Sequence, residues 1–233
     1  MSATTTASTT AATGKAPANA NMKGWGRKDM AARLARDIPE GWYVNLGIGI
    51  PLLVGDYIPA DREVVLQSEN GIVGMGPLQT RANLDTWIVN AGKQNVTLMK
   101  GAAMVSHSDS FAMIRGGHLD LCVLGSFEVA ANGDFANWTT SLKSVPAVGG
   151  AMDLAVGAQR IWLIMEHTSK EGKPRLLETC TMPLTAPGVV KRVYTNLAVV
   201  DITAQGYELV EMNPEITFEA LQERTGAKLH RKG

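Results

Sequence analysis

Residues 63–77 of the chain read EVVLQSENGIVGMGP. The apolar residues Val64 to Leu66 predict a short buried strand. This strand should end at Ser68-Glu69-Asn70-Gly71, because Asn tolerates left-handed backbone and Gly adopts it freely. A carboxylate, that of Glu69, is therefore expected where a strand ends. In open α/β sheets, ligands bind at the carboxyl ends of the strands, so the stretch points to a fold class and to a site at once.

The segment that follows Glu69 is rich in glycine. Gly71, Gly74 and Gly76 are unfavourable in a helix interior, and they let backbone amides approach a ligand closely. A carboxylate beside such amides suits nucleophilic attack on an acyl group, with the amides holding the oxyanion. On these residues alone, the alternative is an ordinary Asn-Gly turn that carries a solvated acid.

Composition places the chain among globular proteins. Its 233 residues are 45% hydrophobic and 19% charged, which suits one α/β domain with a well-buried core. The 22 basic residues balance 22 acidic ones, so no basic field indicates a nucleic acid or a membrane surface as partner. Cys122 and Cys180 are far apart and lack metal-ligand spacing, which predicts a reducing compartment, the cytoplasm.

The chain divides into a tail and one domain. Residues 1–22 are mainly Ser, Thr, Ala and Asn, without the apolar core of a secretory signal or the arginines of a transit peptide. We expect a disordered or partner-dependent tail there, followed by a single domain over residues 23–233. Apolar spacing within the domain predicts helices at 27–38, 52–58, 107–115 and 216–224, and strands at 43–46, 96–99, 119–125, 160–166, 197–202 and 207–210.

Two more glycine-rich loops are present, one before the predicted helix at 52–58 and one that opens a further short helix near residue 151, and free amides at helix starts favour anions. Residues 45–51 read NLGIGIP and residues 144–155 read SVPAVGGAMDLA. The first is not a dinucleotide fingerprint, because Leu52 stands where the third glycine is required. Lys93 follows a glycine but lacks the other residues of a P-loop, and an isolated lysine is usually a surface residue.

Two other patterns carry little weight. Ser106, His107 and Asp109 are too close in sequence to predict a catalytic triad. The four histidines do not have metal-ligand spacing, so no metal site is expected.

The motifs at 68–71, 74–77 and 45–51 together resemble those of the glutamate-bearing half, the B (β) chain, of the family I CoA-transferases, and the resemblance extends from about Gly26 to Leu229. It implies an α/β domain with a single open, mostly parallel sheet flanked by helices. It also implies that Glu69 is the nucleophile, which carries acyl and then CoA as covalent intermediates. By the same resemblance, Asn70, Gly71, Gly47 and Gly49 support the oxyanion and the loops. The residues expected to contact CoA are Asn45, Lys93, Gly149, Gly150 and Ala151, with Lys93 on the CoA phosphates.

The resemblance also implies substrates and a partner. Residues 106–118 and 139–148 are similar to members that transfer CoA from succinyl-CoA to 3-oxoadipate, in the catabolism of aromatic compounds. Acetoacetate remains an alternative acceptor, and a non-enzymatic CoA-binding module is an alternative of another class. The family divides its site between two subunits, so an A subunit is expected in a heterodimer or heterotetramer. Coenzyme A would be substrate and covalent intermediate, with no metal and no permanently bound cofactor.

Overall fold

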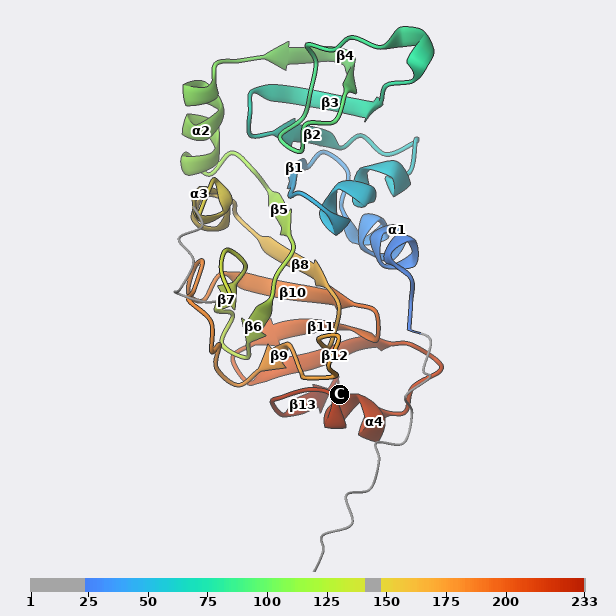
Figure 1. Cartoon of the computed structure of the whole chain (residues 1–233), viewed down its shortest axis with the longest axis vertical. Coiled ribbons are helices and arrows are strands. Elements are labelled where there is room, and N and C mark those ends of the chain that lie inside the picture. Colours follow the sequence, from blue (N-terminus) through green and yellow to red (C-terminus); the bar gives the residue numbers. More distant parts are fainter. Residues whose placement is uncertain (1–23, 141–147, 233) are drawn as a thin grey trace, which may run out of the picture.

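A computed structural model describes residues 24–140 and 148–232 of the chain. Its centre is a ten-stranded sheet in the order β13-β12-β11-β10-β8-β5-β1-β2-β3-β4, which runs along the long axis of the molecule (Figure 1). The predicted tail, residues 1–22, lies outside the described residues, so the predicted domain division stays a prediction. The strands of this sheet are β1 (Tyr43–Leu46), β2 (Val65–Ser68), β3 (Ile72–Leu78), β4 (Val96–Met104), β5 (Leu121–Leu124), β8 (Ile161–Met165), β10 (Val190–Thr195), β11 (Ala198–Thr203), β12 (Gly206–Met212) and β13 (Leu229–Arg231).

A small second sheet and short helices complete the described fold. The second sheet has the order β7-β6-β9. Its strands are β6 (Glu128–Ala130), β7 (Phe135–Ala136) and β9 (Leu176–Leu177). The helices are α1 (Arg27–Asp37), α2 (His107–Arg115), α3 (Ala151–Gly157) and α4 (Phe218–Glu223), with the 3₁₀ helices η1 (Ile50–Tyr57) and η2 (Arg81–Asn83).

The middle of the large sheet is parallel. Strands β2, β1, β5, β8 and β10 pair in parallel in that order, whereas β3 and β4 on one side and β11 and β12 on the other pair antiparallel. The expected open, mostly parallel sheet flanked by helices is therefore confirmed. The expectation did not include the second sheet or the central strand β10.

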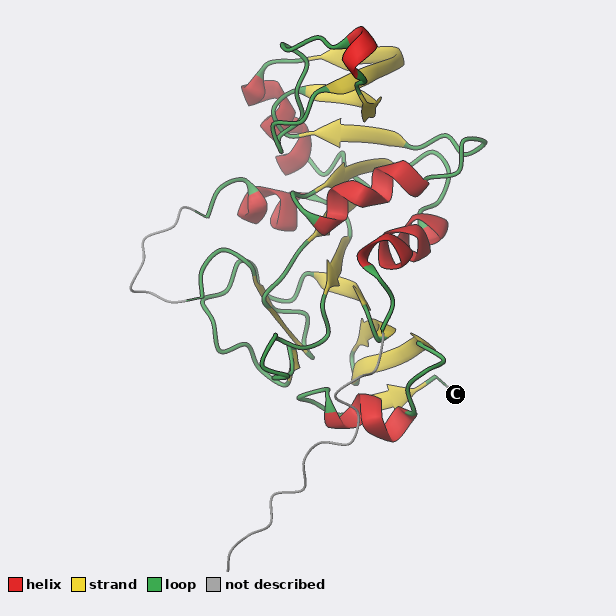
Figure 2. Ribbon diagram, turned by 45° about the vertical axis from the view of Figure 1, so that its right-hand side comes forward, coloured by secondary structure: helices red, strands yellow, loops and turns green. Residues whose placement is uncertain are grey.

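Strand β8 shows why the centre of the sheet is apolar on both sides. Ile161, Leu163 and Met165 pack into one core cluster with residues of α2 and α3, and Trp162 and Ile164 pack into another with residues of α1 and η1. Successive side chains of a strand point to opposite faces, so a strand covered on both faces is continuously hydrophobic. Figures 1 and 2 show α2 and α3 on one side of the parallel strands and α1 on the other.

Helix α2 begins and ends as its sequence predicts. The Ser106 hydroxyl accepts a hydrogen bond from the Asp109 amide at 3.1 Å and donates to the Asp109 carboxylate at 2.7 Å, which caps the first turn. Gly117, with φ of +77°, follows its last turn. The predicted range 107–115 agrees with the observed helix.

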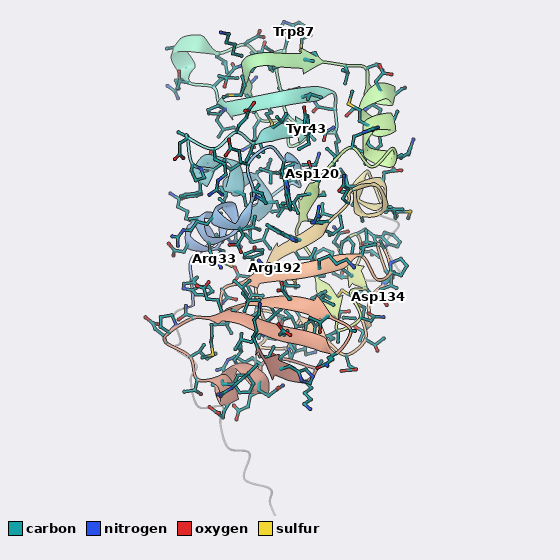
Figure 3. The ribbon with its side chains drawn as sticks, turned by 180° about the vertical axis from the view of Figure 1, so that it is seen from behind. Arg33, Tyr43, Trp87, Asp120, Asp134 and Arg192 are labelled. Carbon is teal, nitrogen blue, oxygen red and sulfur yellow. The ribbon has the colours of Figure 1, made fainter. Side chains whose placement is uncertain are left out.

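An ion-pair network joins α1 to strands β10 and β11 of the large sheet. The Asp37 carboxylate accepts from Arg33 at 2.8 Å, from Arg192 at 3.0 Å and from the Tyr194 hydroxyl at 2.7 Å. Arg192 also donates to Asp201, at 2.5 Å and 2.9 Å. Figure 3 shows Arg33 and Arg192 close together where α1 meets the sheet.

Two local expectations were wrong. Residues 71–77, expected as a glycine-rich segment with free amides, lie almost entirely within strand β3, whose backbone pairs with β2 and β4. Gly74, with φ of +85°, packs against Ala102 of β4 where the register of the β3–β4 pair shifts. The positive φ of this glycine therefore allows a β-bulge in β3. The segment expected as a helix at 52–58 is the 3₁₀ helix η1, which starts earlier, at Ile50.

Within residues 24–140 and 148–232, no helix has both the length and the apolar character that a membrane crossing requires.

Candidate active site

Glu69 occupies the turn that joins β2 to β3, immediately after the carboxyl end of β2. The turn is closed by a hydrogen bond from the Gly71 amide to the Ser68 carbonyl at 2.9 Å. Gly71 has φ of +121°, and a Cβ at this position would collide with the Val105 carbonyl oxygen. Glycine is therefore required here for two reasons, and the Asn-Gly signal correctly located the turn that holds Glu69.

A cavity of about 810 Å³ opens in front of Glu69 and extends along the carboxyl ends of the parallel strands. Its lining includes the residue that follows each central strand: Glu69 after β2, Gly47 after β1, Gly125 after β5, Glu166 after β8 and Asn196 after β10. This is the edge at which open α/β sheets bind ligands, and it is long rather than round because successive strands contribute to it.

The glycine loop before α3 lies directly on the Glu69 carboxylate. A Cβ built on Gly150 would stand 3.2 Å from both carboxylate oxygens of Glu69 and 3.1 Å from Cζ of Phe111 in α2. Three segments far apart in the sequence therefore meet at one point. The amides at the start of α3 have no acceptor within the helix, so they are available to an oxyanion near Glu69.

The surroundings of Glu69 raise the pKa of its carboxyl group above the ordinary 4.5. The main cause is burial, and the negative charge of Asp153 acts in the same direction, whereas the electrostatic interaction with His107 lowers the pKa. Within the described residues, Glu69 has no arginine or lysine within ion-pair distance. A carboxylate of raised pKa is more basic, and hence a better nucleophile, than an exposed one.

A buried chain of hydrogen bonds supports the floor beneath Glu69. Asn45 Nδ2 donates to Gln67 Oε1 at 2.6 Å, and Gln67 Nε2 donates to the Ser110 hydroxyl at 2.8 Å. The Cys122 thiol lies 3.8 Å from Asn45 Oδ1. All four side chains are buried, so the network ties β1, β2, β5 and α2 together below the turn that holds Glu69.

The four residues expected to support the oxyanion do not all face the cavity. Gly47 lines it, but its amide already donates to the Val123 carbonyl at 2.8 Å. Gly49, with φ of +94°, precedes η1 and is outside the lining. Asn70 donates from its side chain to the Val89 carbonyl at 2.7 Å, and the Gly71 amide closes the turn. Their catalytic role stays a prediction, and geometrically the Gly150 loop is better placed for it.

The residues expected to contact CoA fall into two groups. Gly149, Gly150 and Ala151 line the cavity. Asn45 belongs to the buried network, with an exposed fraction of 2%, and Lys93 is exposed on the turn before β4, with φ of +61°; neither lines the cavity. The roles of Asn45 and Lys93 in CoA binding stay predictions.

Three basic residues of the cavity were missed at the level of sequence. Arg27, Lys170 and Arg175 all line it, and Arg27 pairs with Glu166, which follows β8, at 3.6 Å. Lys170 and Arg175 belong to the polar segment between β8 and β9. The available signal was its position, directly after the apolar strand β8.

The family model described as "Coenzyme A transferase" matches residues 27–224 of the chain. The chain belongs to the coenzyme A transferase family. It is therefore an enzyme of that family, in which CoA is a substrate, and the alternative of a non-enzymatic binding module is set aside.

The relatives of this coenzyme A transferase are named for two kinds of CoA acceptor, 3-oxoadipate and a 3-ketoacid. The B subunit of the 3-oxoadipate CoA-transferase of Pseudomonas putida is 52% identical over 87% of this chain and 95% of its own length. The B subunit of the same name from Acinetobacter baylyi is 48% identical over 87% of this chain and 94% of its own. The B subunit of a succinyl-CoA:3-ketoacid coenzyme A transferase of Helicobacter pylori is 43% identical over 87% of this chain and 97% of its own.

Solved structures share the fold at low identity. An acyl-CoA transferase (YdiF) apoenzyme from Escherichia coli superposes with a TM-score of 0.70 at 19% identity, over 88% of this chain and 42% of that one. The decarboxylase AibA/AibB superposes with a TM-score of 0.63 at 21% identity, over 88% of this chain and 85% of that one. Because these two proteins are named for different reactions, the fold alone does not determine the chemistry.

Proposed function

We propose that this chain is the glutamate-bearing half of a CoA-transferase that moves CoA from succinyl-CoA to 3-oxoadipate. One observation carries the mechanism: Glu69 is half-buried, lines the cavity at the strand ends and lies against the glycine loop at Gly150, and its pKa is raised. The acceptor rests on the names of the relatives that are 48% and 52% identical.

The reaction begins when a Glu69 carboxylate oxygen attacks the thioester carbonyl carbon of succinyl-CoA. The carbon–sulfur bond breaks, which gives a mixed anhydride and CoA thiolate. The thiolate then attacks the Glu69 carbonyl carbon, releases succinate and leaves a glutamyl-CoA thioester. A carboxylate of 3-oxoadipate repeats the two steps in reverse order, so that 3-oxoadipyl-CoA leaves and Glu69 is restored.

Each step exchanges one acyl bond for another, so the energy of the thioester is conserved without ATP. Water must be excluded, because hydrolysis of the anhydride or of the glutamyl thioester would release that energy. Amides of the Gly150 loop would stabilise the oxyanion of each tetrahedral intermediate, a contribution of about 10²–10³ in rate for one donor. The covalent route predicts ping-pong kinetics.

We further propose that the active enzyme contains an A subunit, as a heterodimer or heterotetramer, and that it acts in the cytoplasm without a permanently bound cofactor. The subunit names of the relatives support the partner. The two cysteines of this chain are free thiols, which suits a reducing compartment.

Covalent trapping tests the mechanism. The complex with the A subunit is mixed with succinyl-CoA, reduced with borohydride and digested, and the modified peptide is mapped by mass spectrometry. Reduction of the thioester at Glu69 to an alcohol is the expected result. A protein that transfers CoA without modification at Glu69 would refute the proposed nucleophile.

The acceptor is tested separately. The H. pylori relative, at 43% identity, is named for a 3-ketoacid, and acetoacetate, a 3-ketoacid, is the second candidate acceptor. We expect kcat/KM with 3-oxoadipate to exceed that with acetoacetate, and the reverse order would reassign the acceptor while leaving the Glu69 chemistry intact.

A further inference from the structure

Helices α2 and α3 lie next to each other on one side of the large sheet, and α3 starts at the loop that contacts Glu69 (Figure 1). Gly150 is the residue that immediately precedes α3, so the position of α3 decides how close Gly150 stands to the Glu69 carboxylate. A misplacement of the attacking oxygen by about 1 Å can cost on the order of 10²-fold in rate. The contacts that fix α3 against α2 therefore bear on the reaction.

Two contacts join α2 to the start of α3. A Cβ on Gly150 would stand 3.1 Å from Cζ of Phe111, so the phenyl ring lies directly against the loop. Arg115, one turn further along α2, donates from Nε to Asp153 Oδ1 at 2.8 Å. Asp153 is in the first turn of α3, so the ion pair holds the same end of this helix as the phenyl ring does.

Phe111 is itself held by its neighbours on α2. The guanidinium carbon of Arg115 lies 5.5 Å from the centroid of the Phe111 ring, which is a cation–π distance. The His107 ring, four residues earlier, lies 4.6 Å from the Phe111 ring between centroids. Residues four apart on a helix are neighbours, so the ring that contacts Gly150 is supported from both directions along the helix.

The far end of α3 is fixed by other residues. A Cβ on Gly157 would collide with the Ile114 carbonyl oxygen, so α3 ends directly against the backbone of α2. Gln159 Nε2 also donates to the Gly117 carbonyl at 3.2 Å. Loss of the Arg115 ion pair should therefore release the end of α3 that carries the glycine loop and leave its other end in place.

The exposure of the ion pair argues against a mainly stabilising role. The side chain of Arg115 is 63% exposed, and that of Asp153 is 33% exposed. Ion pairs between exposed side chains contribute little to the free energy of unfolding. A weak contact can nevertheless matter for a rate when it fixes the distance between two groups at the reacting centre.

We infer that Phe111, Arg115 and Asp153 are positioning residues, which hold the glycine loop at Gly150 against the Glu69 carboxylate and so fix the oxygen that attacks. The inference rests on the proposed function, because it takes Glu69 as the nucleophile. The three residues act through Gly150, and none of the three lines the cavity.

Matched variants test the inference in the complex with the A subunit. The test variants are Arg115→Gln, Asp153→Asn and the double variant. Arg231→Gln is the control, because Arg231 is 67% exposed, pairs with Glu219 at 3.7 Å and lies 4.3 Å from the ring centroid of Phe218. This second pair joins β13 to α4, and no described residue of either element lines the cavity.

Arg115→Gln should lower kcat and kcat/KM for succinyl-CoA by the same factor, about five-fold, because the position of the oxygen matters only when attack takes place. Asp153→Asn should have a similar effect. The double variant should lose no more than the larger single loss, because both substitutions break one contact. The affinity for CoA and the midpoint of urea denaturation should stay near those of the wild type.

Hydrogen exchange gives a readout that does not depend on activity. Exchange of the backbone amides at 148–152, measured by mass spectrometry, should become faster in Arg115→Gln and stay unchanged in Arg231→Gln. Because the two arginines have the same kind of surroundings, the comparison separates the position of the contact from its chemistry.

Four results would overturn the inference: wild-type kcat in Arg115→Gln, an equal loss in Arg231→Gln, additive losses in the double variant, or a loss that disappears at high pH. The last result would mean that the unpaired charge of Asp153 acts only on the pKa of Glu69, which that charge raises. Failure of the proposed function looks different. In that case the wild-type complex would transfer no CoA, while hydrogen exchange at 148–152 would still decide whether Arg115 holds the loop.

Discussion

Asp37 and Glu69 are both half-buried carboxylates, and their surroundings act on them in opposite directions. Around Asp37, burial raises the pKa, but hydrogen bonds from Arg33 and Tyr194 and the charge of Arg192 outweigh it, so the pKa is lowered. Around Glu69, burial acts without a cationic partner of that kind, and the pKa is raised. The first carboxylate is stabilised as a charge and joins α1 to the sheet, and the second is left reactive beside a cavity.

This difference separates stability from reactivity. A charge that the fold stabilises contributes to the free energy of unfolding, whereas a charge that the fold disfavours reduces it. Removing the charge of Asp37 should therefore destabilise the protein and leave its transfer activity unchanged. Removing the charge of Glu69 should abolish transfer and should not destabilise the protein. The predictions below test this contrast in order of decreasing effect.

Glu69→Gln keeps the shape of the side chain and removes the nucleophile, so transfer should fall by about 10⁴-fold or more. Its free energy of unfolding should not decrease, because the folded state disfavours the charged form that the substitution eliminates. Steady-state transfer and urea denaturation measure the two effects. Glu69→Asp should be nearly as inactive, since the shorter side chain misplaces the attacking oxygen. Substantial transfer by the Gln variant would remove Glu69 from the mechanism.

Asp37→Asn should lower the free energy of unfolding by about 2–3 kcal/mol, because Arg33 and Arg192 lose a charged acceptor in a half-buried site. The pKa of Asp37 is lowered in the fold, so its stabilising effect is present above the unfolded value of 3.8 and is lost as the pH falls through the folded value. The difference between variant and wild type in urea denaturation should therefore shrink in acid. kcat should remain near the wild-type value.

A control for this variant is Glu219→Gln. Glu219 pairs with Arg231 at 3.7 Å, and both side chains are largely exposed. Its free energy of unfolding should change by less than about 0.5 kcal/mol. If both variants lost the same amount of stability, the Asp37 network would have no special role.

Gly150→Ala tests the contact at the reactive carboxylate. The new Cβ would stand 3.2 Å from both oxygens of Glu69, so the carboxylate or the loop must move by a few tenths of an ångström. We expect kcat to fall by about 10–100-fold, because attack depends on the position of the oxygen. Gly125→Ala, which also lines the cavity but would meet no atom within 4 Å, should have a much smaller effect. Equal kinetics for the two variants would contradict the contact.

The smallest expected effect is on pH dependence. kcat/KM should fall in acid as Glu69 gains a proton, and this limb should lie at a higher pH than for an exposed glutamate, because the pKa of Glu69 is raised. The electrostatic interaction with His107 opposes that rise, so His107→Asn should move the limb to still higher pH. His118→Asn, at the other end of α2, is the control, and a limb that stayed fixed in both variants would exclude His107 from the environment of Glu69.

The sequence by itself determined what depends on neighbours in the chain. Ser68-Glu69-Asn70-Gly71 specified a turn at a strand end, because Gly71 supplies a positive φ that other residues rarely adopt. The caps of α2 and the apolar run of β8 follow from equally local rules. Because these rules consider only neighbours in the chain, they missed strand β3 and the type and start of helix η1. In both segments, strand pairing or packing with remote residues decided the conformation.

Only the tertiary structure decided what surrounds Glu69. Gly150 stands against its carboxylate, and Phe111 of α2 stands against Gly150, and no spacing in the sequence encodes that meeting of three segments. Arg175 faces the same cavity only because the parallel strands order their carboxyl ends along one edge. Reactivity and charge at the site are properties of burial and of distances between remote residues, and folding alone establishes both.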